Sequence, residues 1–93
     1  MKLKYSSDAV EDLMRLREFI AEHDPVAAGR IAQRLVTGIR TLKAYPRLGH
    51  PVSRAPDPQS VRDLVLGSYV VRYVVFDTHI LVLRVWHHKE QRD

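Results

Sequence analysis

The sequence predicts an α+β fold in which an antiparallel helix hairpin packs on one face of a small antiparallel sheet. Three observations lead to this prediction: a short alternating run at the amino terminus, two apolar stripes at helical spacing after it, and three β-rich segments beyond residue 60. Helices that are segregated from an antiparallel sheet are typical of this class. The chain has 93 residues, so we expect a single domain, residues 1–93, in the order β-α-α-β-β-β.

The first strand and the first helix meet at a group of capping residues. Leu3 and Tyr5 alternate with lysines, which predicts a strand over Lys2–Tyr5. Ser6-Ser7-Asp8 supplies capping side chains, and Asp8 stands three residues before Glu11, the spacing of a capping box, so a helix is expected from Asp8 to about residue 22. Its apolar residues recur at helical spacing, namely Val10, Leu13, Met14 and Phe19 or Ile20.

Asp24-Pro25 marks the start of the second helix, because aspartate caps a helix and proline fits its first turn. The apolar stripe that follows consists of Ala28, Ile31, Ala32, Leu35, Ile39 and Leu42. About two residues join the helices, which predicts an antiparallel hairpin. Gly38 lowers helix propensity, so we expect close packing there. Tyr45-Pro46 is expected to end this helix, since the residue before proline disfavours helical geometry.

Three strands are predicted after a loop that is rich in proline and glycine. The strands are expected at Val61–Leu66, Tyr69–Phe76 and Ile80–His87, with a two-residue turn at Gly67-Ser68. Alternation along the last strand assigns Val82, Arg84 and Trp86 to one face and Leu83, Val85 and His87 to the other. Because both sets are largely apolar, we expect the helices to cover one face and a partner protein to cover the other.

Composition restricts the function. A net charge of +4 favours an acidic partner such as nucleic acid, a ribosome or an acidic protein segment. The absence of cysteine excludes disulfides and thiolate chemistry. Neither a signal peptide nor a stretch of about 20 apolar residues is present, so a cytoplasmic protein without membrane contact is expected. No cofactor and no metal site are expected, since no spacing brings three ligands together from His50, His79, His87 and His88.

Three segments carry a likeness to a known family. The first contains Ser7-Asp8-Ala9, Asp12-Leu13 and Phe19-Ile20-Ala21. The second is Tyr45-Pro46-Arg47-Leu48-Gly49 followed by Pro51. The third contains Arg62-Asp63-Leu64, Gly67, Tyr69, Tyr73, Ile80 and the closing Arg84-Val85-Trp86-His87. In this order they resemble the RelE/ParE superfamily of bacterial toxins. The resemblance implies a RelE/ParE-like fold and the toxin of a type II toxin–antitoxin pair, neutralised by a cognate antitoxin.

The resemblance leaves a choice of mechanism, because RelE-type members cleave messenger RNA on the ribosome whereas ParE-type members block DNA gyrase. RelE-type sequences usually place an arginine after the aromatic residue that matches Tyr69, and this chain has Val70. It also lacks a tyrosine after Tyr73 and an acidic residue within Tyr45–Arg54. We therefore favour the ParE-like branch, a non-enzymatic toxin that binds gyrase or a similar target. The alternatives are a ribosome-dependent, metal-independent RelE-type endoribonuclease and a non-toxic member that only binds antitoxin.

The candidate site residues lie mainly in the carboxy-terminal third. If the chain is a nuclease, the catalytic candidates are Arg62, Arg84, His87, His88 and Lys89, and Arg92 belongs to the same basic set. For binding of the antitoxin or the target, the candidates are Arg62, Arg72, Arg84, Trp86, His87 and Lys89. His87 and His88 point to opposite faces if both lie in the strand, so at most one joins a given site. The basic residues Arg30, Arg34 and Arg40 form either a solvated helix face or a contact with DNA or gyrase.

Overall fold

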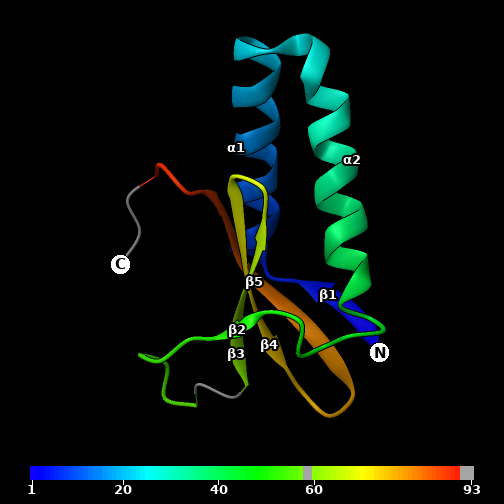
Figure 1. The fold of residues 1–93 in the computed structure, drawn as a ribbon, viewed down its shortest axis with the longest axis vertical. Helices are drawn as coiled ribbons and strands as arrows, with labels where there is room; N and C mark the ends of the chain where they lie inside the picture. Colours follow the sequence, from blue (N-terminus) through cyan, green and yellow to red (C-terminus); the bar gives the residue numbers. More distant parts are fainter. Residues whose placement is uncertain (58–59, 91–93) are drawn as a thin grey trace.

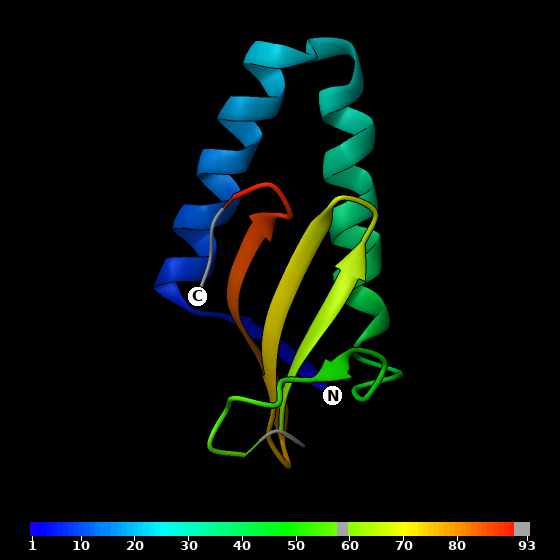
Figure 2. The ribbon, with the colours of Figure 1, turned by 60° about the vertical axis from the view of Figure 1, so that its left-hand side comes forward.

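A computed structural model describes residues 1–57 and 60–90. The elements are β1 (Lys2–Tyr5), α1 (Ser7–His23), α2 (Pro25–Thr41), β2 (His50–Pro51), β3 (Val61–Leu66), β4 (Tyr69–Val75) and β5 (His79–His87). The helices form an antiparallel hairpin whose joined end extends beyond the sheet (Figures 1 and 2). The predicted α+β class and the helix hairpin are thus confirmed. Neither helix in the described part of the chain has the length and apolar character needed to cross a membrane.

The five strands form one mixed sheet in the order β1-β5-β4-β3-β2. Three pairs are antiparallel, but β1 runs parallel to β5, with Leu3 opposite Ile80. The expected antiparallel sheet is therefore wrong at this edge, because β1 joins the sheet beside the last strand and in the same direction. Strand β2 was not predicted; it is only two residues long, with His50 opposite Asp63.

The helix caps agree with the sequence at α2 and differ at α1. Asp24 accepts a hydrogen bond from the Ala27 amide at 3.1 Å, as expected. At α1 the cap is Ser6 rather than Asp8: the Ser6 hydroxyl accepts from the Ala9 amide at 3.0 Å. The predicted capping box of Asp8 and Glu11 is therefore wrong, whereas Ser6, the first of the three predicted capping residues, does satisfy the first turn. Helix α2 ends at Thr41, before Tyr45-Pro46, because residues 42–44 close tighter turns.

A β-bulge in β5 changes the predicted alternation. Arg84 lies opposite Arg72, but the next pair joins Val82 to Tyr73, so Leu83 is the extra residue. As a result Val82 and Val85 both point to the helix side, and both are fully buried. The assignment of Val85 and His87 to the face opposite Arg84 and Trp86 is correct, whereas the assignment of Val82 is wrong because the bulge resets the alternation.

The core lies between the helix hairpin and one face of the sheet. It contains Ala9, Leu16, Ile39, Leu42, Leu64, Val71, Tyr73, Ile80, Val82 and Val85. Gly38 allows α2 to approach β3, since a Cβ atom at Gly38 would lie 2.5 Å from Cδ2 of Leu66. The close packing expected at Gly38 is confirmed. Gly67, with φ +61°, occupies the first position of the tight turn between β3 and β4, as a type II′ turn requires.

Candidate functional site

The predicted binding residues lie in three separate places. Arg62 is buried beneath the loop that precedes β2, while Arg72 and Trp86 lie on the face of the sheet that the helices leave open. Arg84, His87 and Lys89 lie where β5 ends beside α1. The candidates therefore do not form one cluster, and the role of each is a separate question.

Arg62 and Tyr73 hold the loop that precedes β2. The Arg62 guanidinium donates from Nη1 to the carbonyl oxygens of Gly49 at 2.8 Å and of Arg47 at 3.3 Å. The Tyr73 hydroxyl donates to the Pro46 carbonyl at 2.7 Å and accepts from the Gly49 amide at 2.9 Å. Arg62 is only 7% exposed. Its observed contacts therefore support the loop, and it lies away from the end of β5.

The open face of the sheet combines an ion pair with apolar side chains. Arg72 donates to both carboxylate oxygens of Asp63, from Nε at 2.8 Å and from Nη2 at 2.9 Å, and this hydrogen-bonded pair raises the pKa of Arg72. Its guanidinium carbon lies 5.1 Å from the ring centre of Trp86, within cation–π range. The strand registers place six apolar side chains on this face, namely Val61, Val65, Val70, Val74, Leu81 and Trp86. Only Trp86 among them is buried.

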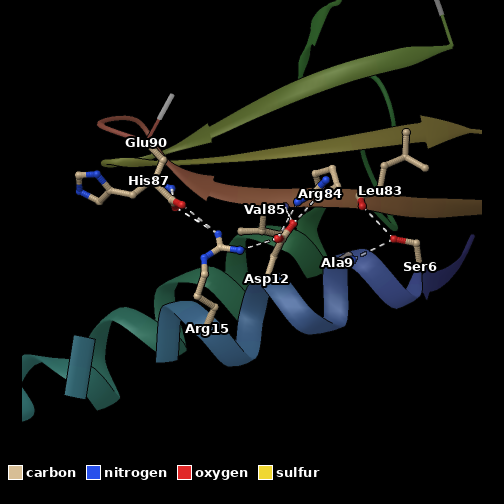
Figure 3. A network of polar contacts seen from close by, with 9 residues as sticks. All are labelled: Ser6, Ala9, Asp12, Arg15, Leu83, Arg84, Val85, His87 and Glu90. Atoms are coloured by element: carbon tan, nitrogen blue, oxygen red, sulfur yellow. Dashed lines mark hydrogen bonds and ion pairs between the residues drawn. The ribbon is translucent and has the colours of Figure 1, made fainter. Parts of the chain in front are cut away.

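Asp12 is the centre of a polar network between α1 and β5 (Figure 3). Its carboxylate accepts from Arg84 Nε at 2.8 Å and Nη2 at 3.0 Å, from the Val85 amide at 2.9 Å and from Arg15 Nη1 at 2.7 Å. Burial alone would raise the pKa of Asp12, but the hydrogen bonds from Arg84, Val85 and Arg15 outweigh it and lower that pKa to about 2. Asp12 is therefore an anion held inside the protein by cations and a backbone amide.

The network closes an edge of the sheet. Strand β1 ends at Tyr5, so β5 has no strand neighbour on that side beyond Val82. The Ser6 amide donates to the Val82 carbonyl at 2.9 Å, and the Ser6 hydroxyl donates to the Leu83 carbonyl at 2.8 Å. Asp12 then accepts from the Val85 amide. Helix α1 and its cap thus satisfy the backbone groups that the departing strand leaves open (Figure 3).

The chain turns after β5 and is held against α1. Glu90 accepts from Nη2 of Arg15 at 3.2 Å and from the His87 amide at 2.9 Å. The Lys89 amide donates to Nδ1 of His87 at 3.1 Å, which places the ring proton on Nε2. Burial, with smaller contributions from the charges of His88 and Lys89, lowers the pKa of His87. His87 is therefore a neutral side chain near pH 7, and its ring points away from Asp12 (Figure 3).

His87 lines two hollows of the surface. The larger, of about 720 Å³, lies between α2 and the β3–β4 turn, and its polar lining consists of Gln33, Arg34, Thr37, Ser68, Tyr69 and His87. The smaller, of about 370 Å³, lies between α1 and the end of β5 and also contains Lys89. Tyr69 meets the His87 ring edge-on at 5.2 Å. Donor groups and the Arg34 cation make the larger groove suitable for a polar or anionic group.

The remaining candidates add little to a reactive centre. His88 stacks on the His87 ring at 4.7 Å, and its Nδ1 lies 3.2 Å from the Ser68 carbonyl oxygen. Lys89 is exposed. Arg92 lies outside the described residues. Over residues 1–57 and 60–90, no three histidine or carboxylate side chains are grouped as metal ligands would be.

Asp12 was missed as a key residue by the sequence analysis. The buried residues of α1 are Ala9, Asp12, Leu16 and Ile20, whereas Val10, Met14 and Phe19 of the predicted stripe are exposed. The signal was a carboxylate at a core position of an amphipathic helix, where a charge requires partners. The sequence showed that position but not the strand edge that Asp12 meets.

Comparison with known proteins places these features in context. Residues 3–92 match the model of a family described as the ParE toxin of type II toxin–antitoxin system, parDE. Toxin RelE2 of Caulobacter vibrioides is 35% identical over 80 residues, which cover 85% of each chain. Toxin RelE1 of the same organism is 32% identical over 84 residues, which cover 90% of this chain and 89% of the relative.

Two solved structures share the fold. A chain of the chromosomal ParDE toxin–antitoxin system from P. aeruginosa has a TM-score of 0.78 and 26% identity, over 94% of this chain and 95% of that one. A chain of the toxin–antitoxin complex RelBE2 from Mycobacterium tuberculosis has a TM-score of 0.69 and 26% identity, over 92% of this chain and 95% of that one.

Proposed function

The chain belongs to the ParE toxin family and is the toxin of a type II toxin–antitoxin system, and from this premise we propose that it inhibits DNA gyrase or a similar target by binding. The proposed toxin acts in the cytoplasm without catalysing a reaction. A cognate antitoxin neutralises it by covering the open face of the sheet.

One observation carries this proposal: the groups that a ribonuclease would need are apart or engaged elsewhere. RNA cleavage requires groups that activate the ribose hydroxyl, neutralise the phosphate and protonate the leaving oxygen. Arg84 is bound to Asp12, and Arg62 binds the loop backbone. Glu90, the carboxylate that contacts the His87 backbone, accepts from Arg15 and the His87 amide. This arrangement favours a binding surface over a reactive centre.

Induction of the chain in cells that lack the antitoxin tests the target. The proposal expects loss of plasmid supercoiling and a DNA-damage response, while messenger RNA stays intact. Translation arrest with cut messages would refute the proposal and establish the nuclease. Absence of any effect on growth, with the chain shown to be folded, would indicate a non-toxic member that only binds antitoxin.

His87 is the best residue for testing the site. His87→Ala is expected to weaken toxicity at least about tenfold, because the ring lines both hollows, while the fold is retained. His79→Ala at the other end of β5 is the matched control and is expected to leave toxicity unchanged. Equal toxicity of both variants would exclude His87 from the site. Arg84→Ala is a poor test, since it removes two hydrogen bonds to the buried Asp12 carboxylate.

The open face is the proposed antitoxin surface because five of its six apolar side chains, all but Trp86, remain exposed or partly exposed. A short antitoxin segment that folds on binding would cover them. Val65→Asp is expected to weaken antitoxin binding at least about 100-fold, as Val65 is 58% exposed on this face. Val26→Asp, at a 91% exposed position on α2, is the control. If calorimetry gave the same antitoxin affinity for Val65→Asp and Val26→Asp, the antitoxin would bind to another surface.

A RelE-type messenger RNA endoribonuclease is the second candidate. Two relatives bear the name RelE, and His87 combines a lowered pKa with a groove that contains Arg34. In that case His87 would move a proton and Arg34 would contact phosphate. The induction experiment above separates this function from gyrase inhibition.

A further inference from the structure

Positive charge is concentrated in α2 and the loop that follows it. Residues 25–56 contain six of the 15 lysines and arginines and none of the 11 acidic residues. Such a run is unusual in a chain whose other segments mix both signs. The excess charge therefore has a definite place in the fold.

The exposed side of α2 is entirely basic or neutral. Its buried residues are Ala27, Leu35 and Ile39. On the exposed side lie Arg30, Gln33, Arg34, Thr37, Arg40 and Thr41. This helix stands at the margin of the molecule, with one side turned away from α1 and the sheet (Figures 1 and 2). We call the surface formed by Arg30, Arg34 and Arg40 the basic face.

Within residues 1–57 and 60–90, the arginines of the basic face form no ion pair with a carboxylate. Arg15, Arg72 and Arg84, by contrast, are paired with Asp12, Asp63 or Glu90. Arg30 and Arg34 are four residues apart, a spacing at which like charges repel and weaken a helix. A repulsion without an internal benefit indicates that the charges serve an external anion.

We propose that the basic face binds the phosphate backbone of duplex DNA, so that the toxin recognises its topoisomerase target in the DNA-bound form. This inference rests on the proposed function. Arg30 and Arg40 are separated by about 15 Å along the helix axis, a length over which each DNA strand places a phosphate about every 3.4 Å. Gln33 and Thr37 lie between the arginines and supply neutral donors to phosphate oxygens.

The side chains favour a duplex over a single strand. Helix α2 contains no aromatic residue, and binding of single strands relies on aromatic side chains that stack on bases. Backbone contact by arginine and polar side chains needs no base exposure. The basic face also meets the groove that contains Arg34 and His87, so DNA on α2 would lie next to the proposed target-binding residue.

The inference is tested with the full chain, freed of antitoxin, and a labelled DNA duplex of arbitrary sequence and about 20 base pairs. Fluorescence anisotropy gives Kd as a function of potassium chloride concentration. Arg30→Gln/Arg34→Gln is expected to weaken binding at least about tenfold and to lower the slope of log Kd against log salt by about 2. Arg30→Lys/Arg34→Lys keeps the charges and is expected to keep the slope.

The control is Lys2→Gln/Arg17→Gln, which removes the same charge from β1 and α1 and is expected to leave the slope unchanged. Equal loss in both glutamine variants would overturn the proposal, because net charge alone would then explain binding. Absence of duplex binding by the wild type would overturn it as well. So would tighter binding to an RNA duplex or to a poly-glutamate peptide than to DNA.

A supercoiling assay with purified gyrase separates this inference from the proposed function. Gyrase inhibition by a wild-type chain that does not bind DNA would refute the inference and leave the proposed function intact. DNA binding that depends on Arg30 and Arg34 with no effect on gyrase would refute the proposed function and the link to a topoisomerase. The expected result is that Arg30→Gln/Arg34→Gln inhibits gyrase at least about tenfold less than the control Lys2→Gln/Arg17→Gln does.

Discussion

The two helices of the hairpin are equal in length, with 17 residues each, but they are attached to the sheet in different ways. Helix α1 binds β5 through charge, because Asp12 meets Arg84 and the Val85 amide. Helix α2 binds β3 by close approach, because Gly38 leaves room for Leu66. Charges on α1 therefore contribute to the fold, whereas those on α2 remain available to a partner.

The largest expected effect comes from breaking the attachment of α1. Asp12→Ala removes the acceptor of the Val85 amide and of Arg84 and one of the two acceptors of Arg15, and we expect it to lower the free energy of unfolding by about 2–3 kcal/mol. Urea denaturation at pH 7 measures this change. Glu18→Ala on the exposed side of the same helix is the control, with an expected change below about 0.5 kcal/mol. Equal effects would show that the carboxylate is not central to the attachment.

Acid should weaken the same attachment. The folded-state pKa of Asp12, about 2, is below its ordinary value of 3.8. Asp12 therefore stabilises the fold above about pH 4, and this contribution of about 2 kcal/mol is lost as the pH falls toward 2. Urea denaturation across this range measures it, and Asp12→Asn is expected to flatten the dependence. If the free energy of unfolding of Asp12→Asn depended on pH as steeply as that of the wild type, other carboxylates would be responsible for the acid sensitivity.

A pair of glycine variants sharpens the description of α2. A Cβ atom at Gly29 would have no neighbouring atom within 4 Å, so Gly29→Ala is expected to raise the free energy of unfolding by about 1 kcal/mol through helix propensity. Gly38→Ala gains the same propensity but displaces Leu66, which offsets the gain. The free energies of unfolding of the two variants, measured by thermal unfolding, should differ by at least about 1 kcal/mol. Equal stabilisation would mean that α2 is not closely packed at Gly38.

The smallest effect is expected on the basic face. Arg34→Gln removes a charge that forms no ion pair with the described residues, so stability should change by less than about 0.5 kcal/mol. The change should be a gain at low salt, because the repulsion with Arg30 disappears, and it should vanish at high salt. A loss that persists in high salt would reveal a structural role for Arg34 and weaken the contrast between the helices.

Local signals in the sequence were sufficient for much of the fold. Asp24-Pro25 and Gly67-Ser68 each determine a cap or a turn through their own chemistry, and both predictions are confirmed. Ser6 and Asp8 were both predicted as capping residues, and local sequence did not decide between them. Ser6 is the cap, and its hydroxyl also binds the distant Leu83 carbonyl. The bulge at Leu83 and the parallel pairing of β1 depend on contacts between the two ends of the chain, which local patterns do not record.

The candidate site was predictable in position rather than in detail. His87 and Lys89 lie beside surface hollows, but nothing in the residue types showed that Arg84 would bind Asp12 or that Arg62 would bind a loop. In the sequence, an arginine that contacts a ligand cannot be distinguished from one that pairs with an internal carboxylate. The role of each site residue remains a prediction for the variants described above.

The position of β5 has a consequence for folding during synthesis. This strand lies inside the sheet, between β1 and β4, yet in sequence it follows every other helix and strand of the described residues. Pairing of β1, closure of the Asp12 network and burial of Val82 and Val85 all require residues of β5, which are translated after those of the other elements. Contacts of such high sequence separation form late and slowly. The sheet therefore cannot form completely during synthesis before β5 itself has left the ribosome.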